Sequence, residues 1–360
     1  MPSLRCLSSS GAVRPVQPMR LVLGIAASGM LVSACMSSST PAATQAPSSV
    51  PASLTRSAGA AAASPAATAP GIVAVTTGGA LVKLNPATGA TEQTLVSSGV
   101  LGDEISASAT GTLYYAVKSG CTGKIESVPA SGGTPAVIAS GSVPAISPDG
   151  ATLAYADEPA QQEGCLAGSA DPVSLYHLKI RKLSGGTTTA LRAVPASQDS
   201  GLPSPISHLS WSSDNVHLAV SIAAVQDNEG WGVNLVDTSR ARYYLSGTGV
   251  TSVPVTGSPT PQQSYLREGV YMPDGGLFVS RACCGGDPPR NTSRLMWEVG
   301  TDGLLTHQVA VGFAAVDHTS LDVSADGRWL LYLAGNDLYV SPGGARPHLL
   351  RTGLTAAAWG

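Results

Sequence analysis

The chain has little charge, few aromatic side chains and no segment with the period of an amphipathic helix. Asp, Glu, Lys and Arg make up 12% of its 360 residues, and Phe, Trp and Tyr 5%. The formal net charge is −3, and no stripe rich in Lys and Arg is present, which argues against nucleic-acid binding. Gly and Pro are frequent instead, at 41 and 26 residues, as expected where many turns separate short strands. The length allows one large all-β domain or two smaller ones.

Catalytic signatures are also missing. The sequence has no Gly-x-Ser-x-Gly elbow, no His-Glu-x-x-His pair, no phosphate-binding glycine loop, and no cysteine spacing typical of zinc. We therefore assign no catalytic residue, no cofactor and no metal ligand. One open alternative is that His208 and His318 meet across a channel with Asp317 or Glu268 and hold a metal. The remaining histidines are scattered: His177, His217, His307 and His348.

The first 34 residues have the composition of an export signal. Arg14 and Arg20 precede an apolar run, Leu21 to Ala34, that is too short to span a membrane comfortably as a mature helix. The run ends in Leu31-Val-Ser-Ala-Cys35, which resembles the lipobox of bacterial lipoproteins. That resemblance implies cleavage before Cys35 and lipid (palmitate-type) acylation of its thiol, with the protein anchored on the outer face of the cytoplasmic membrane. The alternative is an ordinary secretory signal cleaved near Ala34.

Residues 35–70 consist almost entirely of Ala, Ser, Thr, Pro and Gly, with one charge at Arg56. Such a segment buries too little apolar surface to offset the entropy lost on ordering. We expect a flexible tether between the lipid anchor and a folded domain formed by residues 71–360.

A strand–turn–strand pattern recurs through the folded domain. The clearest copy is Ala145 to Tyr155, whose turn Ser147-Pro-Asp-Gly150 combines the fixed φ of Pro with the turn preference of Asp-Gly. The other copies are Leu209 to Val220, Gly269 to Val279, Leu321 to Tyr332 and, more weakly, Ile105 to Tyr115. Strand–turn–strand units repeated at such intervals predict the blades of a β-propeller, with Asp149, Asp274 and Asp326 as turn residues.

Each unit continues with a third strand, a Gly-rich turn and a fourth strand. In the fourth unit, the last strand is expected at Ala241 to Leu245. Residues 71–97 contain three strands without a first one, and Leu354 to Trp359 resembles a first strand without successors. The simplest arrangement lets the two termini complete one blade, because a closed ring has no exposed sheet edge. The sequence therefore predicts an all-β, six-bladed propeller closed by its terminal strands.

These Ser-Pro-Asp-Gly hairpins resemble those of the TolB-like, WD-repeat-like propellers of bacterial envelope proteins, above all at Ile146 to Tyr155 and Leu321 to Tyr332. The resemblance covers roughly residues 71–360, and it is closer to the propeller lipoproteins and secreted propellers of actinobacteria than to the Tol system protein of Gram-negative bacteria. It implies a six-bladed ring and a protein or peptide partner, and no catalytic residue.

Four cysteines remain in the expected mature domain: Cys121, Cys165, Cys283 and Cys284. An even number in an oxidising compartment indicates disulfides, and four cysteines allow three pairings. We favour a Cys121–Cys165 link between adjacent blades and a ring between the sequence neighbours Cys283 and Cys284. That ring would either stiffen its loop or form a rigid platform for a ligand.

Long connections and charged residues gather on one predicted face of the ring. The second-to-third-strand connections of units three, four and five are long, and loops on a rigid scaffold commonly carry function. Residues just before the first strands would lie at the channel mouth on that face. The expected binding residues are Asp103, Glu104, His208, Arg267, Glu268, Asp317, His318, Arg281 and Asp287.

Two functions follow from these observations. The favoured one is a monomeric, membrane-anchored scaffold that binds an envelope protein, peptide or cell-wall component without catalysis. The alternative is an extracytoplasmic hydrolase or lyase with its site at the channel mouth.

Overall fold

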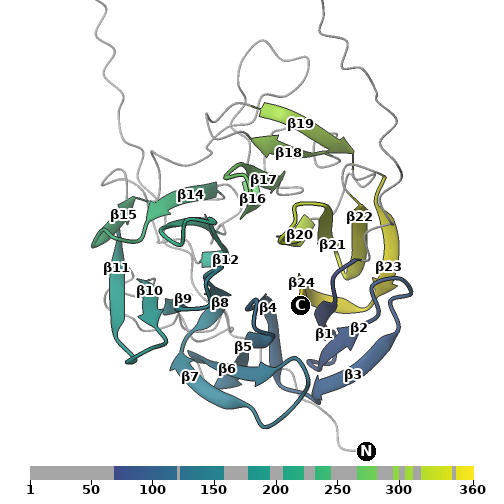
Figure 1. Cartoon of the computed structure of the whole chain (residues 1–360), viewed down its shortest axis with the longest axis horizontal. Coiled ribbons are helices and arrows are strands. Elements are labelled where there is room, and N and C mark those ends of the chain that lie inside the picture. Colours follow the sequence, from purple (N-terminus) through teal and green to yellow (C-terminus); the bar gives the residue numbers. More distant parts are fainter. Residues whose placement is uncertain are drawn as a thin grey trace, which may run out of the picture. The chain divides into compact units, whose positions relative to one another are not determined.

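In a computed structural model, all regular structure of the described residues is β-strand. The described residues are 69–119, 122–157, 177–194, 206–222, 232–244, 266–281, 295–299, 305–310, 318–342 and 346–360. Their strands form six sheets arranged around a central axis, as Figure 1 shows. The prediction of a six-bladed β-propeller is confirmed.

Blades 1 to 3 each contain four antiparallel strands, from the innermost outward. Blade 1 comprises β24 (Leu354–Trp359), β1 (Ile72–Thr76), β2 (Leu81–Leu84) and β3 (Thr91–Val96). Blade 2 comprises β4 (Val100–Ala107), β5 (Thr112–Ser119), β6 (Thr122–Pro129) and β7 (Ala136–Ser140). Blade 3 comprises β8 (Ser142–Ile146), β9 (Thr152–Asp157), β10 (His177–Lys182) and β11 (Thr188–Val194).

The other three blades follow the same order, except that blade 4 has three strands. Blade 4 comprises β12 (Ile206–Trp211), β13 (His217–Ile222) and β14 (Gly232–Asp237). Blade 5 comprises β16 (Leu266–Tyr271), β17 (Leu277–Arg281), β18 (Leu295–Val299) and β19 (Leu305–Ala310). Blade 6 comprises β20 (His318–Val323), β21 (Trp329–Ala334), β22 (Asp337–Pro342) and β23 (His348–Thr352).

The outer strand expected for blade 4 pairs with blade 3 instead. β15 (Arg242–Tyr244) lies parallel to β11, with Arg192 opposite Arg242 and Val194 opposite Tyr244. The prediction that residues 241–245 complete blade 4 is therefore wrong. The first three strands of a blade are tied by the apolar pattern of both faces, whereas the outermost strand has a neighbour on one side only, so its sequence does not specify which sheet it joins.

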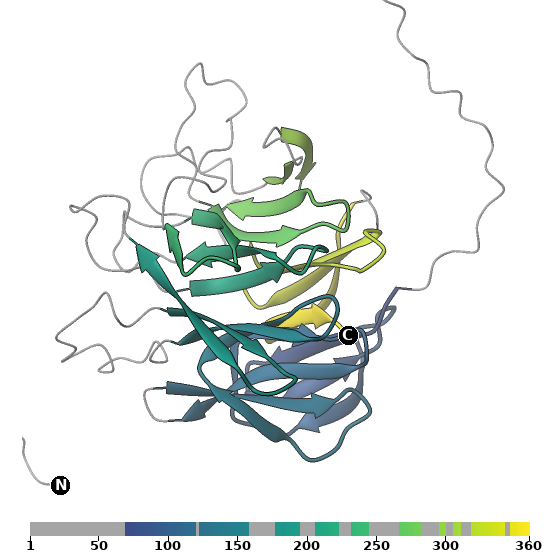
Figure 2. The ribbon, with the colours of Figure 1, turned by 60° about the vertical axis from the view of Figure 1, so that its left-hand side comes forward.

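The ring is closed by the two ends of the domain. β24 pairs with β1 from Ile72 opposite Trp359 onward, and the amide of Gly360 donates to the carbonyl of Gly71 at 2.8 Å. In Figure 1 the C-terminus lies at the inner side of the ring, and Figure 2 shows β24 beside β1. The predicted closure by terminal strands is confirmed.

The hydrophobic core is divided among the six interfaces between neighbouring blades. Each buried cluster of the described residues takes its members from two adjacent blades. In β21, Leu331 and Leu333 pack toward blade 1, whereas Leu330 and Tyr332 pack toward blade 5. The second strands are therefore apolar on both faces, which explains continuous apolar runs where a one-sided sheet would alternate.

Candidate functional site

A cavity of about 810 Å³ lies in the central channel. Its walls are the inner strands β4, β8, β12, β16, β20 and β24, together with the turns that follow five of them. The turn residues Ala109, Pro148, Ser213, Pro273 and Asp326 line it and are exposed. The cavity therefore opens on the face that carries the Ser-Pro-Asp-Gly-type turns.

The inner end of the cavity is built by irregular strand pairing. Register shifts interrupt five inner strands, for example between Ile206 and His208 in β12 and between Thr319 and Asp322 in β20. Val143 and Ser320 have positive φ angles of 51° and 50° at these irregularities, which is uncommon for residues other than Gly. Bulges redirect side chains and often accompany functional sites.

The polar groups at the inner end of the cavity come from equivalent positions of different blades. The first turn residue of five blades accepts a backbone bond from the residue three positions later: Ser108, Ser147, Ser212, Met272 and Ser324. Four residues before these turn residues stand Glu104, Val143, His208, Glu268 and Ser320. The propeller repeat thus places two carboxyl groups and an imidazole at one depth of the channel.

Glu104, His208 and Glu268 form a buried cluster, with 7%, 4% and 4% of their surface exposed. The Nδ1 atom of His208 lies 2.9 Å from Oε2 of Glu104 and 3.8 Å from Oε2 of Glu268. The same Glu268 oxygen accepts a hydrogen bond from the Leu321 amide of blade 6 at 3.0 Å. Desolvation raises the pKa of Glu268, and the charges of His208 and Arg267 oppose this rise.

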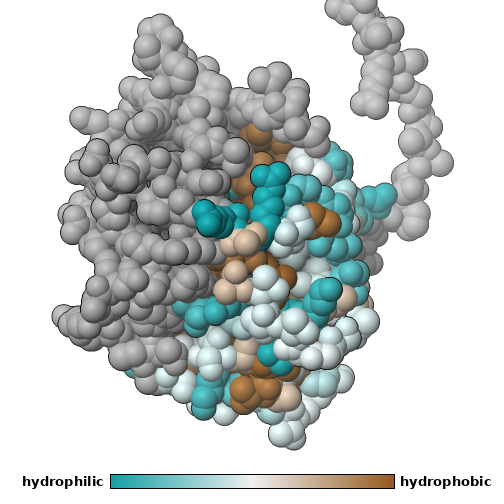
Figure 3. All heavy atoms as spheres, turned by 90° about the vertical axis from the view of Figure 1, so that its left-hand side faces the viewer, coloured by the Kyte–Doolittle hydropathy of each residue, from teal (hydrophilic) through white to brown (hydrophobic). Residues whose placement is uncertain are grey.

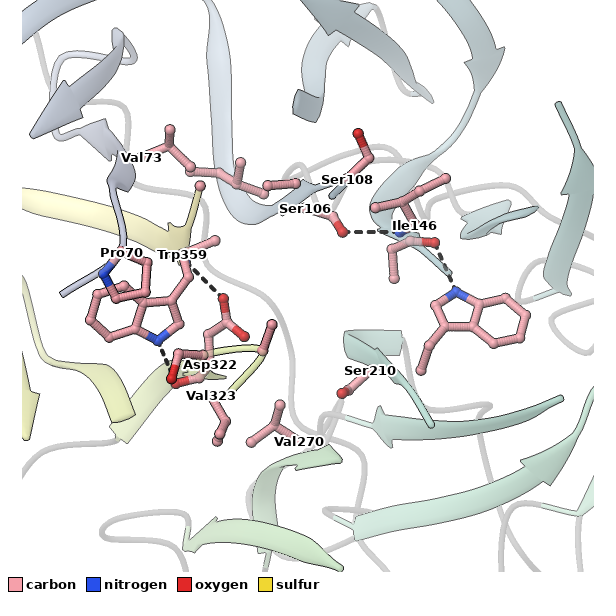
Figure 4. A pocket seen from close by; sticks show the side chains of 18 of the residues that line it. Pro70, Val73, Ser106, Ser108, Ile146, Ser210, Val270, Asp322, Val323 and Trp359 are labelled. Atoms are coloured by element: carbon pink, nitrogen blue, oxygen red, sulfur yellow. Dashed lines mark hydrogen bonds between the residues drawn. The ribbon is translucent and has the colours of Figure 1, made fainter. Parts of the chain in front are cut away.

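Asp322 of β20 lies nearer the cavity mouth, where blade 6 meets blade 1. Its Oδ2 accepts a hydrogen bond from the Trp359 amide at 2.8 Å, and its carbonyl accepts one from the Trp359 indole at 3.3 Å. Figure 4 shows these two bonds, with Pro70 beside the indole. Desolvation raises the pKa of Asp322 to about 6.

Neighbouring inner strands are linked by related bonds around the ring. Ser106 and Ser210 stand two residues before the turn, as Asp322 does, and each hydroxyl accepts a backbone amide of the next blade, from Ile146 and Tyr271 respectively, at 2.9 Å. Trp211 donates its indole to the carbonyl of Ala145 in the preceding blade at 3.0 Å. These bonds fix the cavity wall, so the site is preformed.

The structure brings together some of the predicted binding residues. Glu104, His208 and Glu268 meet, but they are buried in the channel wall rather than on an exposed charged rim. Asp103 belongs to β4, Arg267 to β16 beside Glu268, and Arg281 ends β17. Because the long connections leave the opposite ends of the strands, the cavity that the structure describes opens on the other face from the one we expected.

His318 is fully buried and packs edge to face on Tyr332, with ring centroids 5.5 Å apart. Neither of its ring nitrogens has a hydrogen-bond partner among the described residues, and desolvation lowers its pKa to about 4. In the described part of the chain, no three His, Cys, Asp or Glu side chains gather closely enough to hold a metal ion.

Several predictions concern residues outside the described ranges. These residues are Cys35, Cys121, Cys165, Cys283, Cys284, Asp287 and Asp317. The lipid anchor and the disulfides therefore stay predictions. Within the described ranges, no helix is long and apolar enough to cross a membrane.

Sequence reasoning missed Asp322, Ser106, Ser210, Trp211 and Trp359. Their signal was available in the repeat, since each stands one or two residues before a turn or the chain end. Aligning the units on the turn would have brought Asp322, Ser106 and Ser210 to one position and Trp211 to the next, whereas Trp359 has no such turn after it.

The outer surface of the described residues shows no comparable binding site. Figure 3 shows one side of the propeller, on which hydrophobic atoms of the described residues occur in several separate places. The most exposed large apolar side chains are Val137, Val216 and Leu349, at 63%, 40% and 48%. They lie on β7, in the turn after β12 and on β23, so they are too scattered to form one docking patch.

Ring and site together define a closed six-bladed β-propeller with a cavity in its channel. No family model and no curated protein matches the sequence. Among solved structures, the chain is similar to TolB from Acinetobacter baumannii, with 16% identity and a TM-score of 0.52 over 80% of this chain and 65% of that one.

The chain is also similar to two further solved structures. A chain of the nidogen/laminin complex has 11% identity and a TM-score of 0.51, over 80% of this chain and 97% of that one. A putative TolB from Agrobacterium tumefaciens has 15% identity and a TM-score of 0.48, over 80% and 91%. The fold is that of the TolB-type propellers, as the sequence resemblance implies.

Proposed function

We propose that this protein is a membrane-anchored, extracytoplasmic scaffold that binds a segment of an envelope protein or peptide in its channel cavity, without catalysis. The observation that carries the proposal is the preformed cavity of about 810 Å³, which opens between exposed turns. Its volume is in the range of ligand-binding clefts. Its wall combines apolar side chains with a few convergent polar groups, which is the usual composition of preformed ligand-binding pockets.

The lipid anchor rests on the sequence around Cys35. The described chain begins at Ala69, and Pro70 and Gly71 line the cavity. The proposed tether directly precedes these lining residues in the sequence. This supports a partner that is itself close to the membrane. The solved nidogen/laminin structure is a complex between proteins.

A hydrolase or lyase is the second candidate. The pair of His208 and Glu104, 2.9 Å apart at the inner end of a cavity, resembles the arrangement of a general base with an orienting carboxylate. No nucleophile is paired with this candidate base, because Nε2 of His208 has no hydrogen-bond partner among the described residues. Binding therefore remains the favoured function.

Site-specific photo-crosslinking in native membranes tests the proposal. A benzophenone amino acid is placed at Ala109 or Ser213, which lie in different turns at the mouth, or at Leu349 on the outer strand β23 as the control. We expect both mouth positions to give the same discrete adduct and Leu349 to give none. Equal adducts at all three positions, or none at the mouth, would contradict a partner in the cavity.

A further inference from the structure

Below the exposed turns, the cavity lining carries more carboxyl groups than Lys or Arg side chains. Glu104, at the inner end, and Asp322, nearer the mouth, contribute two carboxyl groups to the lining. Glu268 lies outside the lining, within 3.8 Å of His208, and the charges of Glu104, Glu268 and Asp322 interact with that of His208. Lys83 is the one Lys or Arg among the described lining residues, and it stands on β2. A group entering from the mouth therefore passes Asp322 and then meets Glu104 and His208 at the inner end.

His208 adds an observation that is independent of the acidic cluster. Its side chain lines the cavity and is 4% exposed, and its Nδ1 faces Glu104. Its Nε2 has no hydrogen-bond partner among the described residues. A buried polar atom without a partner costs free energy unless a ligand or water satisfies it. Nε2 of His208 can thus form a hydrogen bond with a ligand at the inner end of the cavity.

The wall between mouth and end is suited to an apolar stem. Trp359, Val270 and Ile146 present carbon surface toward the cavity (Figure 4). Ser106 and Ser210 interrupt it with hydroxyl groups that already accept bonds from the neighbouring blades. A long aliphatic side chain that ends in a positive charge fits this cavity. Its methylene stem would contact the apolar wall, while its charged head would reach the carboxylate oxygens.

We propose that the inner end of the cavity receives the cationic side chain, Lys or Arg, of a bound peptide segment. This inference rests on the proposed function and names the chemistry that the cavity recognises. The entering cation would lie near Asp322 and Glu104, where it compensates carboxylate charge that burial leaves poorly solvated. An anionic or neutral side chain would gain no such compensation.

The test uses fragments of the two side chains as probes. The purified full chain in detergent is titrated calorimetrically with n-butylguanidinium, n-butylammonium and the neutral analogue N-butylurea. We expect millimolar binding of at least one cation, and binding of the urea that is weaker by about tenfold or more. Cation affinity should fall from pH 8 to pH 5, because protonation of Asp322, with its pKa of about 6, removes one attracting charge.

Variants locate the site. Asp322→Asn and Glu104→Gln should each weaken cation binding by about fivefold or more, a cost near 1 kcal/mol. Glu92→Gln removes the same charge from the exposed strand β3, outside the cavity lining, and should leave affinity unchanged. Equal binding of cations and urea to the unaltered protein overturns the proposal, as does an equal effect of Glu92→Gln and Asp322→Asn.

The two proposals fail differently. If the crosslinked adduct at Ser213 forms but is unaffected by Asp322→Asn, a partner occupies the mouth without a cation at the inner end. If the cations bind but no adduct forms, the cation site stands and the macromolecular partner does not.

Discussion

At the scale of single residues, His318 was expected to bind a ligand, but it packs in the hydrophobic core. Its ring is fully buried against Tyr332, and burial lowers its pKa to about 4 from 6.5. The unfolded chain therefore takes up a proton near pH 6.5, whereas the folded chain does so only near pH 4. Stability from this residue is complete above pH 6.5 and is lost as the pH falls toward 4.

His318→Phe should remove that loss, because phenylalanine keeps the edge-to-face contact and does not titrate. Between pH 7.5 and pH 5 the unaltered protein should lose roughly 2 kcal/mol more unfolding free energy than the variant. Urea unfolding at the two pH values measures the difference, and subtracting the variant cancels the other titrating groups. Equal losses in both proteins would show that His318 titrates normally.

At the scale of elements, the recurring turn works through its serine as much as through its aspartate. Buried Ser147 accepts the Thr152 amide at 2.9 Å and donates to Asp149 at 2.6 Å. Ser324 makes the same two bonds with Trp329 and Asp326. Asp149 and Asp326 accept amides two residues on, as expected of turn residues.

Ser324→Ala should therefore lower the free energy of unfolding by about 1–2 kcal/mol, because the Trp329 amide loses its acceptor at a buried position. Ser213→Ala is the matched control, since Ser213 lies exposed in the corresponding turn of blade 4. Its effect should stay within about 0.5 kcal/mol. Comparable effects of the two substitutions in denaturant unfolding would argue that the turn bonds add no stability.

These elements also show what a sequence can predict here. Inner hairpins were predictable because Asp-Gly turns and two-faced apolar strands are local signals. The pairing of β15 with β11 was not, because an outer strand has few contacts to define its partner. Glu104, His208 and Glu268 were found as charges before the inner strands, but their burial depends on bulges such as that between Leu266 and Gly269, which leave no sequence signal.

At the scale of the whole molecule, the ring is held shut by one seam between the first and last strands. Trp359, in the last strand of that seam, ties the strand to blade 6 through the Asp322 bonds and an edge-to-face contact with Trp329, at 6.4 Å between centroids. Trp211 makes the corresponding indole-to-carbonyl bond between blades 3 and 4, and both indoles are 7% exposed. The two tryptophans thus make similar contacts to the preceding blade, but only Trp359 lies on a strand that pairs with the other end of the domain.

Trp359→Ala and Trp211→Ala should each cost about 3–5 kcal/mol of unfolding free energy, the usual loss for a buried tryptophan. The two variants should differ in which part of the propeller unfolds locally. Without Trp359, β24 can leave β1 without unfolding of the remaining blades, so the amides of Val73 and Val75 should exchange hydrogen faster. Trp211→Ala should leave those two amides protected at matched global stability. Equal exchange at β1 in both variants would mean that the seam is no weaker than any other interface of the ring.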